Sequence, residues 1–175
     1  MDSKTIALLM EHQFELAQKF SSIESKNLSG MNHSIPADLD SYEGQAVIRL
    51  FLTYFAEELH EAYEAEGAQR VEEFADALHF AVELCLRVGI VPDPENRGVH
   101  PRLTECTGLI LRRLRNKPWK QTKAQTATHM IKHHTEQLFW AFLDHSGRYG
   151  IPLTKLLESY FAKAKVNHQR ISSGY

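Results

Sequence analysis

Apolar residues recur every three or four positions along most of the chain, which is the spacing of one face of an α-helix. The first such stretch carries Ile6, Leu9, Met10, Leu16 and Phe20 between polar residues. No stretch alternates apolar and polar residues convincingly, so the pattern predicts no strand. The sequence therefore predicts an all-α fold, a helical bundle.

Glycine and proline residues separate the predicted helices. Gly67 and Gly89 end the second and third helices, and the stretch VPDPENRGVHP, with three prolines, breaks the chain after them. We expect five to six helices, over about residues 3–24, 42–65, 69–88, 103–115, 121–147 and 152–170. A length of 175 residues suits a single domain over residues 1–175 with one core.

Acidic residues interrupt the apolar face of the second and third predicted helices. Glu58 lies beneath Phe51 two turns earlier, and Glu61 follows Glu58 by one turn. Glu73 and Asp76 have the same spacing, and helices joined by a short turn pack antiparallel, so the two pairs are expected to face each other. Facing carboxylates repel unless a cation lies between them, and oxygen ligands suit Mg²⁺ or Mn²⁺.

The alternative interpretation is a solvated acidic face, because charged helices often contain the E-x-x-E spacing. We expect that simpler environment for the neighbouring residues Glu64, Glu66, Glu72 and Glu83. His79 lies between Leu78 and Phe80 and is expected to pack or to support the ligands rather than to bind metal.

The C-terminal stretch YFAKAKVNHQRISSGY places Lys163, Asn167 and Arg170 on one helical face. Lysine and arginine suit phosphate, and asparagine can hydrogen-bond a sugar or a base. Tyr175 offers a ring that can stack on a base. The alternative is a frayed, polar helix end.

Five stretches resemble a known superfamily. FAEELHEAYEA followed by VEEFADALHF resembles the metal motifs of the all-α nucleoside triphosphate pyrophosphohydrolases, which include MazG-like enzymes and the dimeric dUTPases. The tail pattern Y-x2-K-x3-N-x2-R-x4-Y resembles the last motif of the dimeric dUTPases and of the phage dCTP/dUTP pyrophosphatases. MEHQFEL is similar to their first motif, whose glutamine would be Gln13, and KPWK (residues 117–120) resembles a Lys/Trp segment.

The resemblance implies hydrolysis of a deoxynucleoside triphosphate, dUTP or dCTP, between the α- and β-phosphates, giving the monophosphate and pyrophosphate. It implies an Mg²⁺-dependent homodimeric enzyme, and the aromatic stretch LFWAF (residues 138–142) suits either core or dimer interface. The resemblance implies that the metal ligands are Glu58, Glu61, Glu73 and Asp76, and that the general base is Glu57 or Glu58. It implies that Lys163 and Arg170 bind phosphates and that Asn167 and Gln13 bind the sugar and the base. The walls of the substrate site would be Phe80, Trp119 and Tyr175, with simple packing an equal alternative for Trp119.

Two other functions remain open. A MazG-like enzyme for another or a modified nucleotide stays possible because Ala17 replaces the family's usual asparagine and KPWK follows the E-x-x-D helix instead of preceding it. A non-catalytic helical module could bind protein or nucleic acid through residues 112–123, although the carboxylate stripe argues against simple packing helices.

Composition bears on the binding partners, the cysteine chemistry and the cellular location of the protein. The net charge of −2 gives no general affinity for nucleic acid or an anionic membrane. Cys85 is expected to be a packed free thiol, and no disulfide is expected with Cys106. We find neither a signal peptide nor an apolar run of the ~20 residues that a membrane span requires, so we expect a cytoplasmic protein, in the host's cytoplasm if the source is viral.

Overall fold

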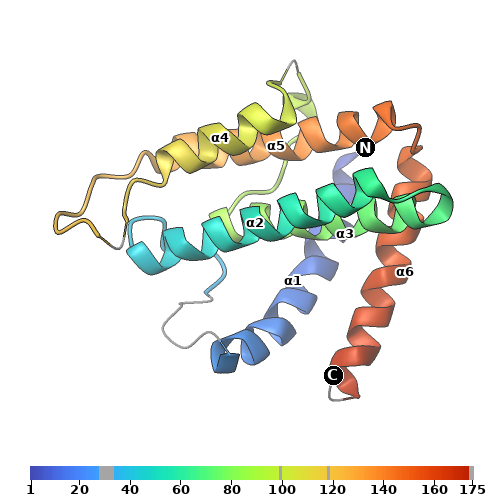
Figure 1. Cartoon of the computed structure of the whole chain (residues 1–175), viewed down its shortest axis with the longest axis horizontal. Helices are drawn as coiled ribbons and strands as arrows, with labels where there is room; N and C mark the ends of the chain where they lie inside the picture. Colours follow the sequence, from blue (N-terminus) through green and yellow to red (C-terminus); the bar gives the residue numbers. More distant parts are fainter. Residues whose placement is uncertain (28–33, 99, 118, 174–175) are drawn as a thin grey trace.

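The computed structural model describes residues 1–27, 34–98, 100–117 and 119–173, and all regular structure within these ranges is helical (Figure 1). The all-α prediction is therefore confirmed. In chain order the elements are α1 (Ser3–Asn27), α2 (Tyr42–Glu64), α3 (Gly67–Val88), the 3-10 helix η1 (Pro94–Asn96), α4 (Leu103–Arg113), α5 (Thr128–Arg148) and α6 (Leu153–Ser172).

The start of α5 is the one boundary that the periodicity misplaced by two turns. The helix begins at Thr128, whereas the sequence predicted a start near residue 121. The preceding segment is bonded to side chains from elsewhere: Oδ1 of the Asn116 side chain accepts from the Ala124 N–H at 2.8 Å, and the Gln45 side-chain amide donates to the Thr126 hydroxyl at 3.0 Å. These bonds satisfy groups of the segment without helix formation.

Helices α2 and α3 form an antiparallel hairpin across the middle of the molecule (Figure 1). Ser41 caps the start of α2, where its hydroxyl oxygen accepts from the Gly44 N–H at 2.9 Å. The turn between the helices is two residues long, and Gly67 at the start of α3 has a φ of 59°. Glycine adopts this left-handed conformation without the steric cost of a Cβ atom, so it permits the tight reversal.

Helix α3 is the central element, in contact with α1, α2, α5 and α6, while α4 packs against α5. Its inner face is fully buried at Phe74, Leu78 and Val82. Trp140 and the phenylalanines on either side of it in LFWAF are at most 1% exposed within one copy of the chain. This aromatic stretch is therefore core, and of the two sequence interpretations the dimer interface is wrong for these side chains.

The sequence also predicted free cysteines and the absence of a membrane-spanning helix. Cys85 and Cys106 are both buried and free, as the sequence predicted for a chain without a disulfide. None of the described helices combines the length and the apolar character that a membrane span requires.

Candidate active site

Three carboxylates converge where α2 and α3 face each other. One oxygen from each of Glu58, Glu73 and Asp76 lies within 4.8 Å of the other two. The three side chains are half-buried, which is the inward placement that the helical spacing predicted. We call these residues the acidic triad.

The other two acidic candidates on α2 lie differently. Glu57 and Glu61 are exposed, and neither belongs to the acidic triad. Glu61 lines a shallow pocket beside the turn between α2 and α3, together with Glu73. It remains close enough for its charge to contribute to the raised pKa of Glu58. The four predicted metal ligands therefore divide into a triad and one more exposed neighbour.

The acidic triad is electrostatically strained by its surroundings. Burial, followed by the charges of neighbouring carboxylates, raises the pKa of Glu58 to about 7. Burial also raises the pKa of Asp76, against the opposing effect of Lys163. A divalent cation among the oxygens would remove both penalties, and a set of carboxylate oxygens is the ligand chemistry that Mg²⁺ and Mn²⁺ prefer. The residues present therefore fit a hard divalent ion.

Removing the charge of Glu58 is expected to stabilise the metal-free protein at alkaline pH. Because the folded pKa of about 7 lies above the ordinary value of 4.5, protonation favours the folded state, and this contribution is lost as the pH rises through 7. With a chelator present, Glu58→Gln should raise the melting temperature at pH 8 by roughly 2–4 °C, the effect of about 1 kcal/mol after allowance for solvent screening. At pH 5 the gain should be much smaller.

Thermal unfolding at both pH values measures this difference. Glu57→Gln is the matched control, since Glu57 is adjacent and exposed, and it should leave the melting temperature unchanged. An equal gain from Glu58→Gln at pH 5 and pH 8 would contradict the assignment, because it would not depend on ionisation.

A cavity of about 480 Å³ begins beside the acidic triad and extends between α1, α2, α3 and α6. We call it the α1–α6 cavity. Two triad members, Glu58 and Asp76, lie on its wall. The structure brings to the same cavity five more of the residues selected from the sequence, namely Gln13, Phe80, Lys163, Asn167 and Arg170.

The positive side of this cavity comes from α6. Lys163 Nζ lies 2.6 Å from Asp76 Oδ2, which joins α6 to the acidic triad. Asn167 and Arg170 follow on the same face, as their spacing predicted, and also line the cavity. A charge gradient therefore runs along the cavity, from carboxylates at one end toward cationic and amide groups of α6.

Aromatic rings form another wall. Phe51, Tyr54 and Phe80 contact one another with ring centroids 5.4–6.2 Å apart. The Arg87 guanidinium, which also lines the cavity, lies 4.7 Å from the centroid of the Phe51 ring, a cation–π contact that helps to hold this wall. A flat, apolar ligand such as a nucleobase suits this kind of surface.

A buried polar network holds Gln13 at the cavity. The Gln13 amide nitrogen donates to Glu83 at 2.9 Å, and Glu83 is paired with Arg87 at 2.7 Å. The Gln13 amide oxygen accepts from the Tyr160 hydroxyl at 3.1 Å and lies 2.8 Å from His79 Nδ1. Since this oxygen only accepts, we assign the proton of His79 to Nδ1. Gln13 is thereby fixed in one orientation.

His79 is neutral in this network. Burial lowers the pKa of His79 to about 3, and its ring stacks on Tyr160 with centroids 3.9 Å apart. The sequence predicted a packed or supporting role for His79. Its placement on the cavity wall, bonded to Gln13, is of that supporting kind.

Glu83 is where the expectation of a solvated side chain was wrong. It is 2% exposed, and its partner Arg87 is completely buried. The sequence does contain an indication of this pair. Glu83 and Arg87 are spaced i, i+4 inside the apolar run FAVELCLRV, and two opposite charges one turn apart in such a run indicate a buried ion pair.

One of the predicted wall residues lies away from this cavity. Trp119 is 75% exposed and lies in the segment between α4 and α5, outside the residues that line the α1–α6 cavity. Tyr175 falls outside the described residues.

Comparison with known proteins adds one finding. Residues 60–175, about two thirds of the chain, match a family model described as dUTPase. The matched range includes Asp76 and the α6 residues and begins just after Glu58. Neither the curated proteins nor the solved structures give a match.

Proposed function

The chain belongs to the dUTPase family, and on that premise we propose that it hydrolyses dUTP between the α- and β-phosphates to dUMP and pyrophosphate. Membership of the family supports a nucleotide pyrophosphohydrolase. The observation that carries the proposal is the meeting of α6 with the acidic triad at Lys163 and Asp76, 2.6 Å apart. It puts a metal-compatible cluster and phosphate-compatible cations on one cavity.

Dimeric dUTPases typically use a divalent metal ion, and we propose Mg²⁺, with Mn²⁺ as a substitute, held by Glu58, Glu73 and Asp76 and supported by Glu61. When bound, the ion would supply charge neutralisation at the phosphates and a water of lowered pKa. Lys163 and Arg170 would bind the β- and γ-phosphate oxygens and stabilise the charge that the leaving pyrophosphate develops.

Glu58 is the better of the two candidate bases. It lines the cavity, whereas Glu57 is exposed and does not. A carboxylate has two oxygens, so Glu58 can face the cation with one and accept the proton of the attacking water with the other. Glu57 is left without a proposed part in proton transfer.

Base recognition would fall to Gln13, with Asn167 on the sugar and Phe80 as a stacking wall. Glu83 accepts one of the two amide hydrogens of Gln13, and the amide oxygen of Gln13 already bonds to Tyr160 and His79. The group left to a base is one N–H donor. We propose that this N–H meets the C4 edge of the base, where uracil presents a carbonyl oxygen that accepts a hydrogen bond and cytosine presents an amino group that donates one. This arrangement favours dUTP over dCTP.

Pyrophosphate release from each deoxynucleoside triphosphate in turn, with and without Mg²⁺, tests the proposal. We expect dUTP to be the best substrate and release to require the ion. Preference for dCTP would contradict the part assigned to Gln13, and preference for a purine or modified nucleotide would favour a MazG-like activity. Inactivity on every nucleotide would favour a non-catalytic helical module.

Three wider features belong to the same proposal. We take residues 1–175 as one catalytic domain acting as a homodimer in the cytoplasm. The support for a dimer is family membership, because the LFWAF side chains are buried within a single copy.

A further inference from the structure

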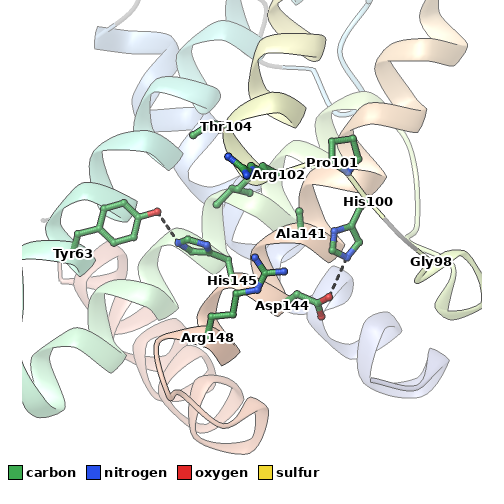
Figure 2. Close-up of a pocket in the computed structure, with 11 residues that line it drawn as sticks. Tyr63, Gly98, His100, Pro101, Arg102, Thr104, Ala141, Asp144, His145 and Arg148 are labelled. Atoms are coloured by element: carbon green, nitrogen blue, oxygen red, sulfur yellow. Dashed lines mark hydrogen bonds and ion pairs between the residues drawn. The ribbon is translucent and has the colours of Figure 1, made fainter.

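A second cavity, of about 530 Å³, lies between the end of α2, the start of α4 and the C-terminal half of α5 (Figure 2). We call it the α4–α5 cavity. It shares no lining residue with the α1–α6 cavity, so it is a separate site on the molecule. Its wall includes Tyr63, His100, Arg102, Asp144, His145 and Arg148.

The charge of this wall is positive. Arg102 and Arg148 both line the cavity, and neither forms an ion pair with any residue in the part of the chain that the structure describes. In the view of Figure 2 the guanidinium of Arg148 lies between His145 and Asp144. Burial and then the charge of Arg148 lower the pKa of His145, as expected beside an uncompensated cation.

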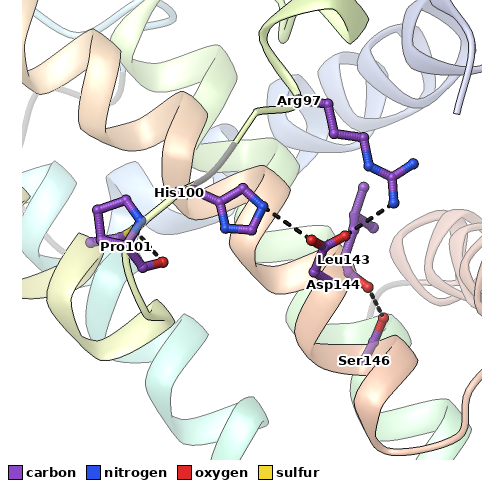
Figure 3. Close-up of polar contacts among 7 residues, drawn as sticks. Arg97, His100, Pro101, Leu143, Asp144 and Ser146 are labelled. Carbon is purple, nitrogen blue, oxygen red and sulfur yellow. Dashed lines mark hydrogen bonds and ion pairs between the residues drawn. The ribbon is translucent and has the colours of Figure 1, made fainter.

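Among the described residues that line the cavity, Asp144 is the single acidic one, and Arg97 and His100 contact its carboxylate. Arg97 Nη2 lies 3.0 Å from one carboxylate oxygen, and His100 Nε2 lies 3.2 Å from the other (Figure 3). The Asp144 charge is thus largely compensated by Arg97, which does not line the cavity. The positive charges of Arg102 and Arg148 therefore stay uncompensated and can attract an anionic ligand.

The start of α4 adds hydrogen-bond donors. Leu103 and Thr104, the first two residues of this 11-residue helix, line the same cavity. The first N–H groups of a helix have no intrahelical acceptor and carry the positive end of its dipole. Glu105 occupies one donor here, since its carboxylate accepts from the Arg102 N–H at 3.1 Å. Thr104 also offers a hydroxyl.

The wall opposite α4 is neutral and firmly placed. The Tyr63 hydroxyl lies 2.8 Å from His145 Nε2, and the Tyr63 ring stacks on Tyr149 with centroids 5.3 Å apart. These contacts hold Tyr63 and His145 beside the arginines. Their mutual hydrogen bond leaves one donor on the neutral pair, either the His145 Nδ1–H or the Tyr63 hydroxyl, for an oxygen atom of a ligand.

We propose that the α4–α5 cavity binds a phosphate-type oxyanion, either free pyrophosphate or the phosphate of a nucleotide, through Arg102, Arg148 and the N-terminal end of α4. Two guanidinium groups and a helix N-terminus form the donor set that proteins use for such anions. The volume of about 530 Å³ is large enough for more than one phosphate group. This site does not depend on the function proposed for the α1–α6 cavity.

Isothermal titration calorimetry with pyrophosphate, in chelator and without divalent ions, tests the site. Lys163→Met combined with Arg170→Gln serves as the background, because this pair removes both cations that we assign to phosphates in the α1–α6 cavity. In this background we expect one pyrophosphate to bind per chain. Adding Arg102→Gln and Arg148→Gln to the same background should weaken that binding by at least about tenfold. Arg112→Gln, an exposed position of the same helix, is the matched control and should bind normally. Loss of all pyrophosphate binding in this background would overturn the proposal.

NMR on the unsubstituted protein keeps the test independent of variant folding. Pyrophosphate should shift the amide resonances of Leu103 and Thr104 and the ring resonances of His145. Unchanged resonances at these residues would refute the site. Titration with dUMP distinguishes the sources: additional shifts at Tyr63 indicate a nucleotide, and shifts with pyrophosphate alone indicate the inorganic anion.

Discussion

Asp76→Asn is expected to lower the turnover of dUTP by at least about 100-fold, the loss that removal of one charged contact in an active site commonly produces. Asp76 is a member of the acidic triad and is also the partner of Lys163, at 2.6 Å. The substitution keeps the shape of the side chain while it removes the negative charge that a divalent ion requires. Rates measured across a series of Mg²⁺ concentrations should show that high Mg²⁺ restores only part of the activity.

Glu72→Gln is the matched control for this effect. Glu72 lies one turn before Asp76 on α3 and is exposed. It is not a member of the acidic triad and does not line the α1–α6 cavity. It should keep turnover within about twofold of the unsubstituted protein, because only an exposed, solvent-screened charge outside the triad and the cavity changes. If Asp76→Asn turned over dUTP at the full rate in saturating Mg²⁺, the triad would not be the metal site.

Glu83→Ala is expected to lower the free energy of unfolding by about 3–5 kcal/mol, the cost of leaving one member of a buried ion pair without its partner. Glu83 is 2% exposed, and the Arg87 side chain that it pairs with at 2.7 Å has no exposed surface. The substitution also removes the acceptor of the Gln13 amide. Urea unfolding at neutral pH measures the loss.

Replacing both members of the pair separates the charge from the packing. Glu83→Leu combined with Arg87→Met fills similar volume without a buried charge, so it should recover most of the stability lost in Glu83→Ala. The exposed control Glu72→Ala should change the unfolding free energy by no more than about 0.5 kcal/mol. A loss as small as the control's in Glu83→Ala would mean that the pair contributes little to stability.

The helices themselves were largely predictable because they follow from local properties of the chain. The 3.6-residue period set the helical class. Gly67 marked the turn of the α2–α3 hairpin and Gly89 its end, because glycine readily adopts positive φ. The start of α5 was not predictable, because the segment before it is bonded to side chains outside that helix, Gln45 on α2 and Asn116 just after α4.

The candidate site was predictable to the extent that it depends on spacing along single helices. The positions of Glu58 and Asp76, and of Lys163 with Arg170, follow from i, i+3 and i, i+7 relations. The same spacing could not distinguish Glu58 from Glu61, because a helix face is broad and its boundary with solvent is set by the helix packed against it. Nor could it say that Trp119 lies away from the cavity.

The sequence by itself determined the helical hairpin, the acidic stripe on it and the cationic face of α6, since each is a local pattern repeated with the period of the helix. Only the tertiary structure decided which acids share one cluster, that Glu83 and Arg87 are buried as a pair beneath Gln13, and that a second, positively charged cavity forms at the start of α4. These features join residues far apart in the chain, and their burial and charge depend on how the helices pack against one another.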